Sequence, residues 1–339
     1  MTEKVERKTG RWMKVEEEEA AEEERAPKPY AYVPLPTGQP AKSSPVKGDG
    51  HKLERQGFLN GQLQGAITAL TPVHVASGLV EMAEEIAPEK AKDWPMVKAF
   101  YRCRGERVIP ASSLKGAVRA VLEAITFSCV SKATPETRVY KQFVECKFEP
   151  EDGKTELCPA CRMFGAPGYM GQVRFSDAVQ EEGGSEVRAI PALYGPGRWQ
   201  RGRRFYRHGQ PAEGKDVPVE VCPAGSRFRF ECHFENLSPG ELGLLLIALG
   251  QGEPPLYLKL GGGKPACLGS VRIEVESLTV RQVREAYLDY EAGAGEDAEV
   301  KRYINIAQRA KTLLFQEGLE ALSEVLRYGE ESACPAQSY

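Results

Sequence analysis

The sequence predicts a mixed α+β fold whose elements follow the order strand, helix, strands, second helix, strand. Serines precede apolar residues at helical spacing after residue 112 and again after residue 238, which indicates two capped helices. Several short runs alternate apolar with polar or small residues, which is typical of half-buried strands. This order is that of a ferredoxin-like βαββαβ unit with insertions, a fold that hosts many functions and decides none.

In the first half, residues 63–69 alternate as a strand that ends at Thr71-Pro72. Residues 77–95 show no strong periodicity. The first helix follows Ser112-Ser113, with apolar residues at positions 114, 118, 121, 122 and 125. Gly171–Phe175 predicts the next strand.

In the second half, residues 217–221 and 228–234 are expected to form the arms of a hairpin. Ser238 with Pro239 and Glu241 predicts the start of a short apolar helix over 242–249, stopped by Gly250. Strands at 256–260 and 271–275 flank a glycine-rich loop, and 279–328 is expected to be helical, with a glycine-rich break at 293–295.

Composition divides the chain into three parts. Residues 1–50 form an acidic, proline-rich tail, 51–278 the folded domain, and 279–339 a helical extension. The net charge is −3 over residues 1–26, +4 over 27–280 and −4 over 281–339. An excess of this size does not by itself indicate a nucleic-acid binder, so that case depends on local clustering.

Some locations are excluded by hydropathy. No apolar run approaches 18 residues, so we expect no membrane-spanning helix and no membrane partner. Met1–Lys14 lacks the apolar stretch of a secretory signal. We therefore expect a cytoplasmic protein whose nine cysteines are reduced thiols, some of them holding metal.

The segment 197–208 is rich in arginine and aromatic residues and contains no acid. Its candidate RNA-binding residues are Arg198, Arg201, Arg203, Arg204, Phe205, Tyr206 and Arg207. Arginines neutralise phosphates, and aromatic rings stack on unpaired bases. The alternative is a solvated loop whose aromatic side chains pack on the core.

Two further stretches are candidate phosphate sites. Lys115 and Arg119 lie four residues apart in the first turns of the helix after Ser112 and Ser113, where free backbone N–H groups favour an anion. Ordinary capping with two surface cations is the alternative. The loop of Gly262, Gly263 and Lys264 can let a nucleic-acid backbone approach closely, or it can be only a tight turn.

Four cysteines are candidate metal ligands. Cys158-Pro159-Ala160-Cys161 is a CxxC motif, which supplies two ligands to a structural Zn²⁺ with little strain. Cys146 and Cys129 are the candidates for the remaining pair of ligands. A thiol redox pair and unpaired core cysteines are the competing interpretations.

Three motifs follow one another between residues 109 and 271. The first is Ile-Pro-Ala-Ser-Ser-Leu-Lys-Gly at 109–116. The second joins Cys161–Gly165 to Val173–Ala178, and the third is the glycine-rich run 260–271. In this order they resemble the RAMP superfamily of CRISPR-associated proteins. One departure is Cys267, because the family's glycine loop usually has another glycine there.

Two more stretches resemble the type III-D branch of that superfamily. Pro29–Leu35 is similar to its N-terminal signature, and Arg201–His208 to its internal R-G-R-K-F-Y motif. The resemblance implies an RRM-like domain with a zinc-bearing insertion at about 129–165. It also implies a backbone subunit of a type III effector complex, with guide RNA, target RNA and other RAMP subunits as partners.

The resemblance further implies a protruding hairpin or loop that kinks the guide–target duplex, for which 77–98 is the candidate. Asp93 lies in a stretch similar to the family's cleavage loop, so it is the candidate for cutting target RNA with Mg²⁺. A solvated loop aspartate is the alternative. Two other functions stay open, a non-catalytic assembly subunit and a guide-processing endoribonuclease that uses His51, His74, His208 or His233.

Overall fold

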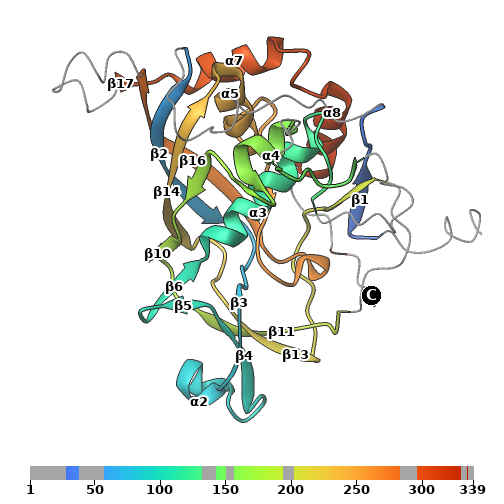
Figure 1. Ribbon diagram of the computed structural model, residues 1–339. Helices are drawn as coiled ribbons and strands as arrows, with labels where there is room; N and C mark the ends of the chain where they lie inside the picture. The colour runs from blue at the N-terminus through green and yellow to red at the C-terminus, as the bar shows by residue number, and fades with distance from the viewer. Residues whose placement is uncertain are drawn as a thin grey trace, which may run out of the picture.

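The computed structural model describes residues 28–37, 57–131, 143–149, 156–193, 202–282, 296–329 and 334. They form the mixed α+β fold that the sequence predicts (Figure 1). The central sheet has the strand order β15-β16-β2-β14-β10-β6-β5, with β9 paired to β14 and β17 to β16. These strands are β2 Leu59–Ala69, β5 Arg102–Cys103, β6 Glu106–Ile109, β9 Val173–Phe175, β10 Ala178–Glu182, β14 Arg227–Leu237, β15 Leu258–Lys259, β16 Ser270–Gln282 and β17 Glu296–Asp297.

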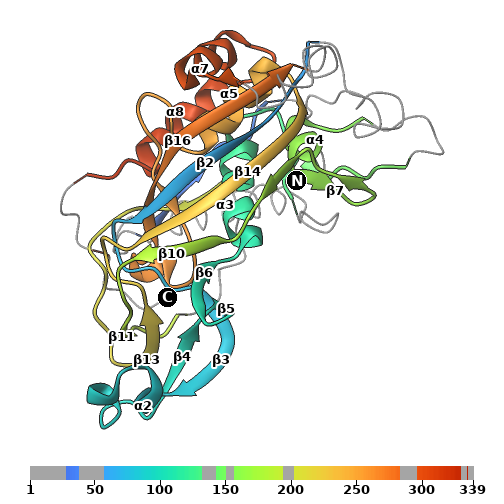
Figure 2. The ribbon, with the colours of Figure 1, turned by 90° about the vertical axis from the view of Figure 1, so that its left-hand side faces the viewer.

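The long strands β16, β2 and β14 lie side by side and antiparallel, followed by β10. Helix α3 (Ala111–Ala124) lies in sequence between β2 and β9, and α5 (Pro239–Ala248) between β14 and β16. This arrangement is compatible with the ferredoxin-like βαββαβ fold. Figure 2 shows the sheet from its open face, with both helices behind it.

Alternation places one apolar face of the sheet against the helices. Ile67 of β2 lies opposite Phe228 of β14 and Ile273 of β16, and all three are buried. Gly65 pairs with Phe230, and a Cβ atom on Gly65 would lie 2.8 Å from the Phe230 ring. Glycine therefore makes room for a large aromatic side chain in the core.

Two more helices extend the helical layer. They are α7 (Val300–Arg309) and α8 (Gln316–Val325). Helix α7 packs on α5 so closely that a Cβ atom on Gly243 would lie 2.0 Å from the Tyr303 carbonyl oxygen. Among the described residues, no helix is long and apolar enough to cross a membrane.

A second sheet of order β11-β13-β4-β3 projects from the lower end of the molecule (Figures 1 and 2). Its strands are β3 Ala76–Met82, β4 Met96–Phe100, β11 Glu186–Ile190 and β13 Val217–Val221. Helix α2 (Ala83–Ile86) and a 3-10 turn (Pro88–Lys90) connect β3 to β4. Residues 77–98 thus form a projecting hairpin.

Buried Glu220 of β13 ties this hairpin to the domain. Its carboxylate accepts hydrogen bonds from the Phe100 N–H at 2.8 Å, Arg102 at 2.6 Å and Arg107 at 3.0 Å. Burial alone would raise the pKa of Glu220, but these hydrogen bonds and the charge of Arg102 lower it below its usual value. Glu220 is therefore a paired buried charge at the base of the hairpin.

Three sequence-based expectations about these elements are wrong. Residues 217–221 and 228–234 are strands but not a hairpin, because β13 pairs with β11 and β4 while β14 pairs with β2. Helix α3 starts at Ala111 without a serine cap, and Asp177 caps it instead by accepting the Ala111 N–H at 2.7 Å. Residues 279–282 continue β16 rather than starting a helix.

The expected cap of α5 is confirmed. Ser238 accepts the Glu241 N–H at 3.3 Å, and the Glu241 carboxylate accepts the Ser238 N–H at 2.9 Å. The expectation of nine reduced cysteines is wrong for two of them, because Cys267 and Cys334 form a disulfide. The other seven are free thiols.

Candidate functional site

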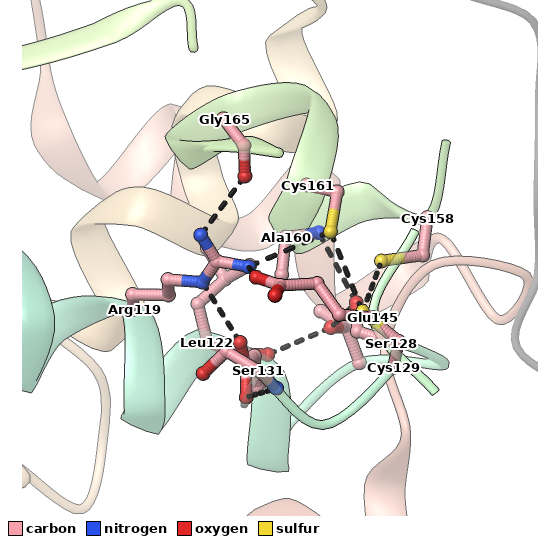
Figure 3. Close-up of polar contacts among 12 residues, drawn as sticks. Arg119, Leu122, Ser128, Cys129, Ser131, Glu145, Cys158, Ala160, Cys161 and Gly165 are labelled. Atoms are coloured by element: carbon pink, nitrogen blue, oxygen red, sulfur yellow. Dashed lines mark hydrogen bonds and ion pairs between the residues drawn. The ribbon is translucent and has the colours of Figure 1, made fainter. Parts of the chain in front are cut away.

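The four candidate metal-ligating cysteines come together from three separate parts of the chain. Cys129 follows α3, Cys146 lies in the next described segment, and Cys158 and Cys161 lie at α4 (Pro159–Phe164). All four sulfurs are within 4.8 Å of one another, and all four residues are buried. The Cys129 sulfur lies 3.4 Å from that of Cys161 and 3.5 Å from that of Cys158 (Figure 3).

This sulfur cluster fits a tetrahedral zinc ion. Zn–S bonds of about 2.3 Å place tetrahedral sulfurs about 3.8 Å apart, close to the spacing here. Contact with Cys146 raises the pKa of Cys129, whereas contact with Cys129 lowers the pKa of Cys158, so these thiols do not titrate independently of one another. Cys129, Cys146, Cys158 and Cys161 can therefore hold a zinc ion.

Arg119 lies beside the cluster (Figure 3). Its guanidinium group is 3.5 Å from the Cys161 sulfur, donates to the Gly165 carbonyl at 2.9 Å, and pairs with Glu123 at 2.8 Å. Burial alone would lower the pKa of Arg119, but the charge of Glu123 raises it. The positive charge of Arg119 would stabilise a zinc ion bound there, because Zn²⁺ with four thiolate ligands would carry a net negative charge.

Arg203 links the cluster to a second element. It donates to the carbonyl oxygens of Ser128 at 3.1 Å and Cys129 at 2.9 Å, and it pairs with Glu123 at 2.7 Å. The structure thus places Arg119 and Arg203 on either side of one buried carboxylate. Both arginines therefore use their charge to pair with Glu123 within the fold.

Arg203 starts β12 (Arg203–Tyr206), which pairs antiparallel with β1 (Tyr30–Val33). This two-stranded ribbon lies beside α8. Tyr30 lies opposite Tyr206, and Tyr32 opposite Arg204. Phe205 packs against the core and Arg207 is exposed, while Arg198 and Arg201 lie outside the described residues.

The predicted phosphate site at α3 is near the surface. Ser112 is exposed, whereas Ser113 and Lys115 are half-buried. Burial lowers the pKa of Lys115, and the charge of Arg119 lowers it further. The positive charges of Lys115 and Arg119 together would favour an anion beside Lys115.

The glycine-rich loop packs against the start of the projecting hairpin. Gly262 donates its N–H to the His74 carbonyl at 2.7 Å, and Gly263 has a left-handed φ of 69°. Lys264 is half-buried, and burial lowers its pKa. Sequence reasoning missed Lys259, a buried lysine that donates to the carbonyls of Cys267 at 3.2 Å and Leu268 at 3.1 Å.

Asp93 is exposed in the connection between α2 and β4, at the tip of the projecting hairpin. That connection lies at the lower end of the molecule, far from α4 in both views (Figures 1 and 2). The structure therefore does not bring Asp93 together with the cysteines.

The histidines differ in their surroundings. His74 is buried and donates from Nδ1 to the Glu220 carbonyl at 2.7 Å. His208 is buried between Ser270 and the Tyr257 carbonyl, and burial lowers its pKa to about 4. His233 is exposed beside Glu231, and His51 lies outside the described residues.

A family model described as the RAMP superfamily matches residues 66–272, which is more than half of the chain. The chain belongs to the RAMP superfamily. The match spans all three internal motifs of this RAMP protein, whereas Pro29–Leu35 lies outside it. No curated protein sequence matches the chain. As a RAMP protein it is a CRISPR-associated, RNA-binding protein, and RAMP proteins generally bind CRISPR RNA and other Cas subunits.

Proposed function

We propose that this RAMP protein is a guide-RNA-binding backbone subunit of a type III effector complex similar to the III-D branch. One observation carries the proposal. The two stretches that resemble III-D signatures, Pro29–Leu35 and Arg201–His208, lie far apart in sequence, yet their strands β1 and β12 pair residue by residue. Their pairing supports one shared function for the two stretches.

The charge of this ribbon suits an RNA backbone. Residues 28–37 and 202–210 contain Lys28, Arg203, Arg204 and Arg207 and no acidic residue. We assign RNA contact to Arg204, Tyr206 and Arg207, and to Ser112, Ser113, Lys115, Gly262, Gly263 and Lys264 at the other two sites. Arg119 and Arg203, which pair with Glu123, position these elements from inside.

In this proposal the zinc ion has a structural role. Bound by four cysteines, it would leave no open coordination position for chemistry. It would fix the loop at Cys129 and helix α4, and Arg162 of α4 pairs with the buried Glu241 of α5. The cysteine segment would thus be fastened both to the helical layer and, through Arg203, to the ribbon.

Target-RNA cleavage is a second candidate function, favoured by the place of Asp93. The hairpin 77–98 projects from the domain and carries exposed apolar side chains, namely Leu79, Val80, Met82 and Met96. We propose that it reaches the guide–target duplex, where the Asp93 carboxylate would help to hold Mg²⁺ near the scissile phosphate. Guide processing is less well supported, because buried His74 and His208 have hydrogen-bond partners inside the fold.

RNA binding by the purified full chain tests the main proposal. Labelled single-stranded RNAs of unrelated sequence are titrated at several salt concentrations. We expect similar affinities for all sequences, with log Kd linear in log salt and a slope of about 0.7 per neutralised phosphate. Absence of salt-dependent binding would favour the alternative, a non-catalytic assembly subunit that contacts mainly proteins.

A further inference from the structure

The outer face of the β1–β12 ribbon carries a cluster of aromatic rings around one guanidinium group. The Tyr30 ring centre lies 5.9 Å from that of Tyr206 and 5.7 Å from that of Tyr32, both edge-to-face. The Arg204 guanidinium lies 5.2 Å from the Tyr30 ring centre and 5.9 Å from that of Tyr206. We call Tyr30, Tyr32, Arg204 and Tyr206 the tyrosine platform.

Strand alternation separates this platform from the anchoring face of the ribbon. Val33 is fully buried, Phe205 packs on the core, and Arg203 is bound by Glu123. The four platform residues point the other way, and each is half-buried. Their rings and charge are therefore not needed to fill the core and are accessible to a ligand.

The chemistry of the platform selects the class of ligand. Tyrosine rings offer flat surfaces on which a nucleobase stacks, and arginine both stacks on a base and neutralises a phosphate. Arg207 is exposed in the next position of the chain, and its N–H donates to the Pro29 carbonyl at 2.7 Å, which extends the pairing by one residue. No acidic residue lies in either stretch to repel a phosphate.

We propose that the tyrosine platform binds an unpaired nucleotide of the RNA, stacking its base on Tyr30 or Tyr206 and holding its phosphate with Arg204. This inference rests on the proposed RNA-binding function and adds that the ribbon takes single-stranded rather than duplex RNA. Bases within an A-form duplex are already stacked on one another, so their faces are not available to tyrosine rings.

The test uses the full chain, with single-stranded RNA that carries the fluorescent base 2-aminopurine and with a duplex of the same sequence. Stacking quenches the fluorescence of this base. We expect Tyr30→Ala/Tyr206→Ala to lose the quenching and to weaken single-strand binding by about tenfold or more. The salt slope stays constant, because no charge is removed, and duplex binding is unchanged.

Two further variants test whether the effect comes from the tyrosine rings rather than from unfolding. Tyr30→Phe/Tyr206→Phe restores the rings and is expected to recover the quenching, which shows that the alanine variant did not merely unfold the ribbon. Met170→Ala removes an exposed apolar side chain from another element and serves as the matched control. Circular dichroism confirms that each variant is folded.

Each outcome decides something. If Tyr30→Ala/Tyr206→Ala still binds RNA in a salt-dependent way and with full quenching, the tyrosine platform does not bind the nucleotide. The proposed RNA-binding function would not be affected by that result. If wild type binds no RNA, both fail. If the chain does not quench 2-aminopurine in RNA but binds a proline-rich peptide through Tyr30 and Tyr206, the platform is a peptide site and the nucleotide assignment is wrong.

Discussion

The guanidinium group of Arg203 in β12 lies 2.7 Å from the carboxylate of Glu123 in α3. Arg119 pairs with the other oxygen of that carboxylate and reaches the sulfur of Cys161. Because Arg203 also donates to the Cys129 carbonyl, one buried network joins α3, the cysteine cluster and the ribbon. The cluster and the ribbon are thus linked through side chains as well as through the chain.

The first prediction concerns Arg203. Arg203→Ala should lower the free energy of unfolding by about 2–5 kcal/mol, because it leaves two buried carbonyls without their donor and leaves buried Glu123 with Arg119 alone. Urea unfolding measures the change. Arg207→Ala removes an exposed arginine from the same segment and should leave the midpoint nearly unchanged. Equal effects of the two substitutions would contradict the buried role of Arg203.

The second prediction concerns the metal. The purified chain should contain about one zinc per molecule by elemental analysis, and a strong chelator should lower its melting temperature. Cys129→Ser should lose the metal, whereas Cys103→Ser, which changes an exposed thiol, should keep it. Retention of zinc by the Cys129 variant would remove that residue from the ligand set.

The third prediction concerns pH. Burial and the charge of Lys264 lower the pKa of Lys259 from 10.5 to about 7. Between pH 7 and 10.5, Lys259 is protonated in the unfolded chain and neutral in the folded chain. Protonation therefore stabilises the unfolded chain as the pH falls from about 10.5 towards 7, and the free energy of unfolding decreases over that range.

Denaturant unfolding between pH 7 and 10 measures this effect. Lys259 should add a slope of up to about 1.4 kcal/mol per pH unit to the stability of the wild type. Lys259→Met should remove this contribution, and Lys147→Met, at an exposed position, should not. A wild-type profile that matches that of Lys259→Met would mean that Lys259 stays charged in the fold.

The sequence predicted the local features of the fold well. Ser238 and Glu241 form the expected cap, since capping depends only on neighbouring residues. The pairing of β13 and β14 was wrong because alternation identifies a strand without naming its partner. The cap of α3 was missed for a similar reason, because Asp177 is distant in sequence.

The candidate site divides in the same way. The sequence named all four candidate ligands, Cys158 and Cys161 from the CxxC motif and Cys129 and Cys146 as the remaining pair, and the structure places the four in one cluster. The sequence could not show that Glu123 lies between Arg119 and Arg203, nor that Tyr30 meets Tyr206, because these contacts join distant segments. Lys259 lies within the apolar run 256–260, and no pattern in the sequence indicated that its side chain is buried.

The fourth prediction concerns Asp93. In a reconstituted complex with guide RNA and Mg²⁺, Asp93→Ala should abolish one specific cut in the target RNA while assembly and guide binding stay intact. Glu89→Ala, at another exposed acid of the same hairpin, is the matched control. An unchanged cutting pattern in the Asp93 variant would leave the chain as a guide-holding scaffold.

The most direct test of the central claim is the salt dependence of single-stranded RNA binding by Arg204→Ala/Arg207→Ala. The account predicts weaker binding and a log–log salt slope smaller by about 1.4, because two phosphate contacts are lost. Arg229→Ala/Arg272→Ala, which removes two exposed arginines from the open face of the sheet, should keep the wild-type slope. Identical slopes for both double variants and the wild type would contradict RNA binding by the ribbon.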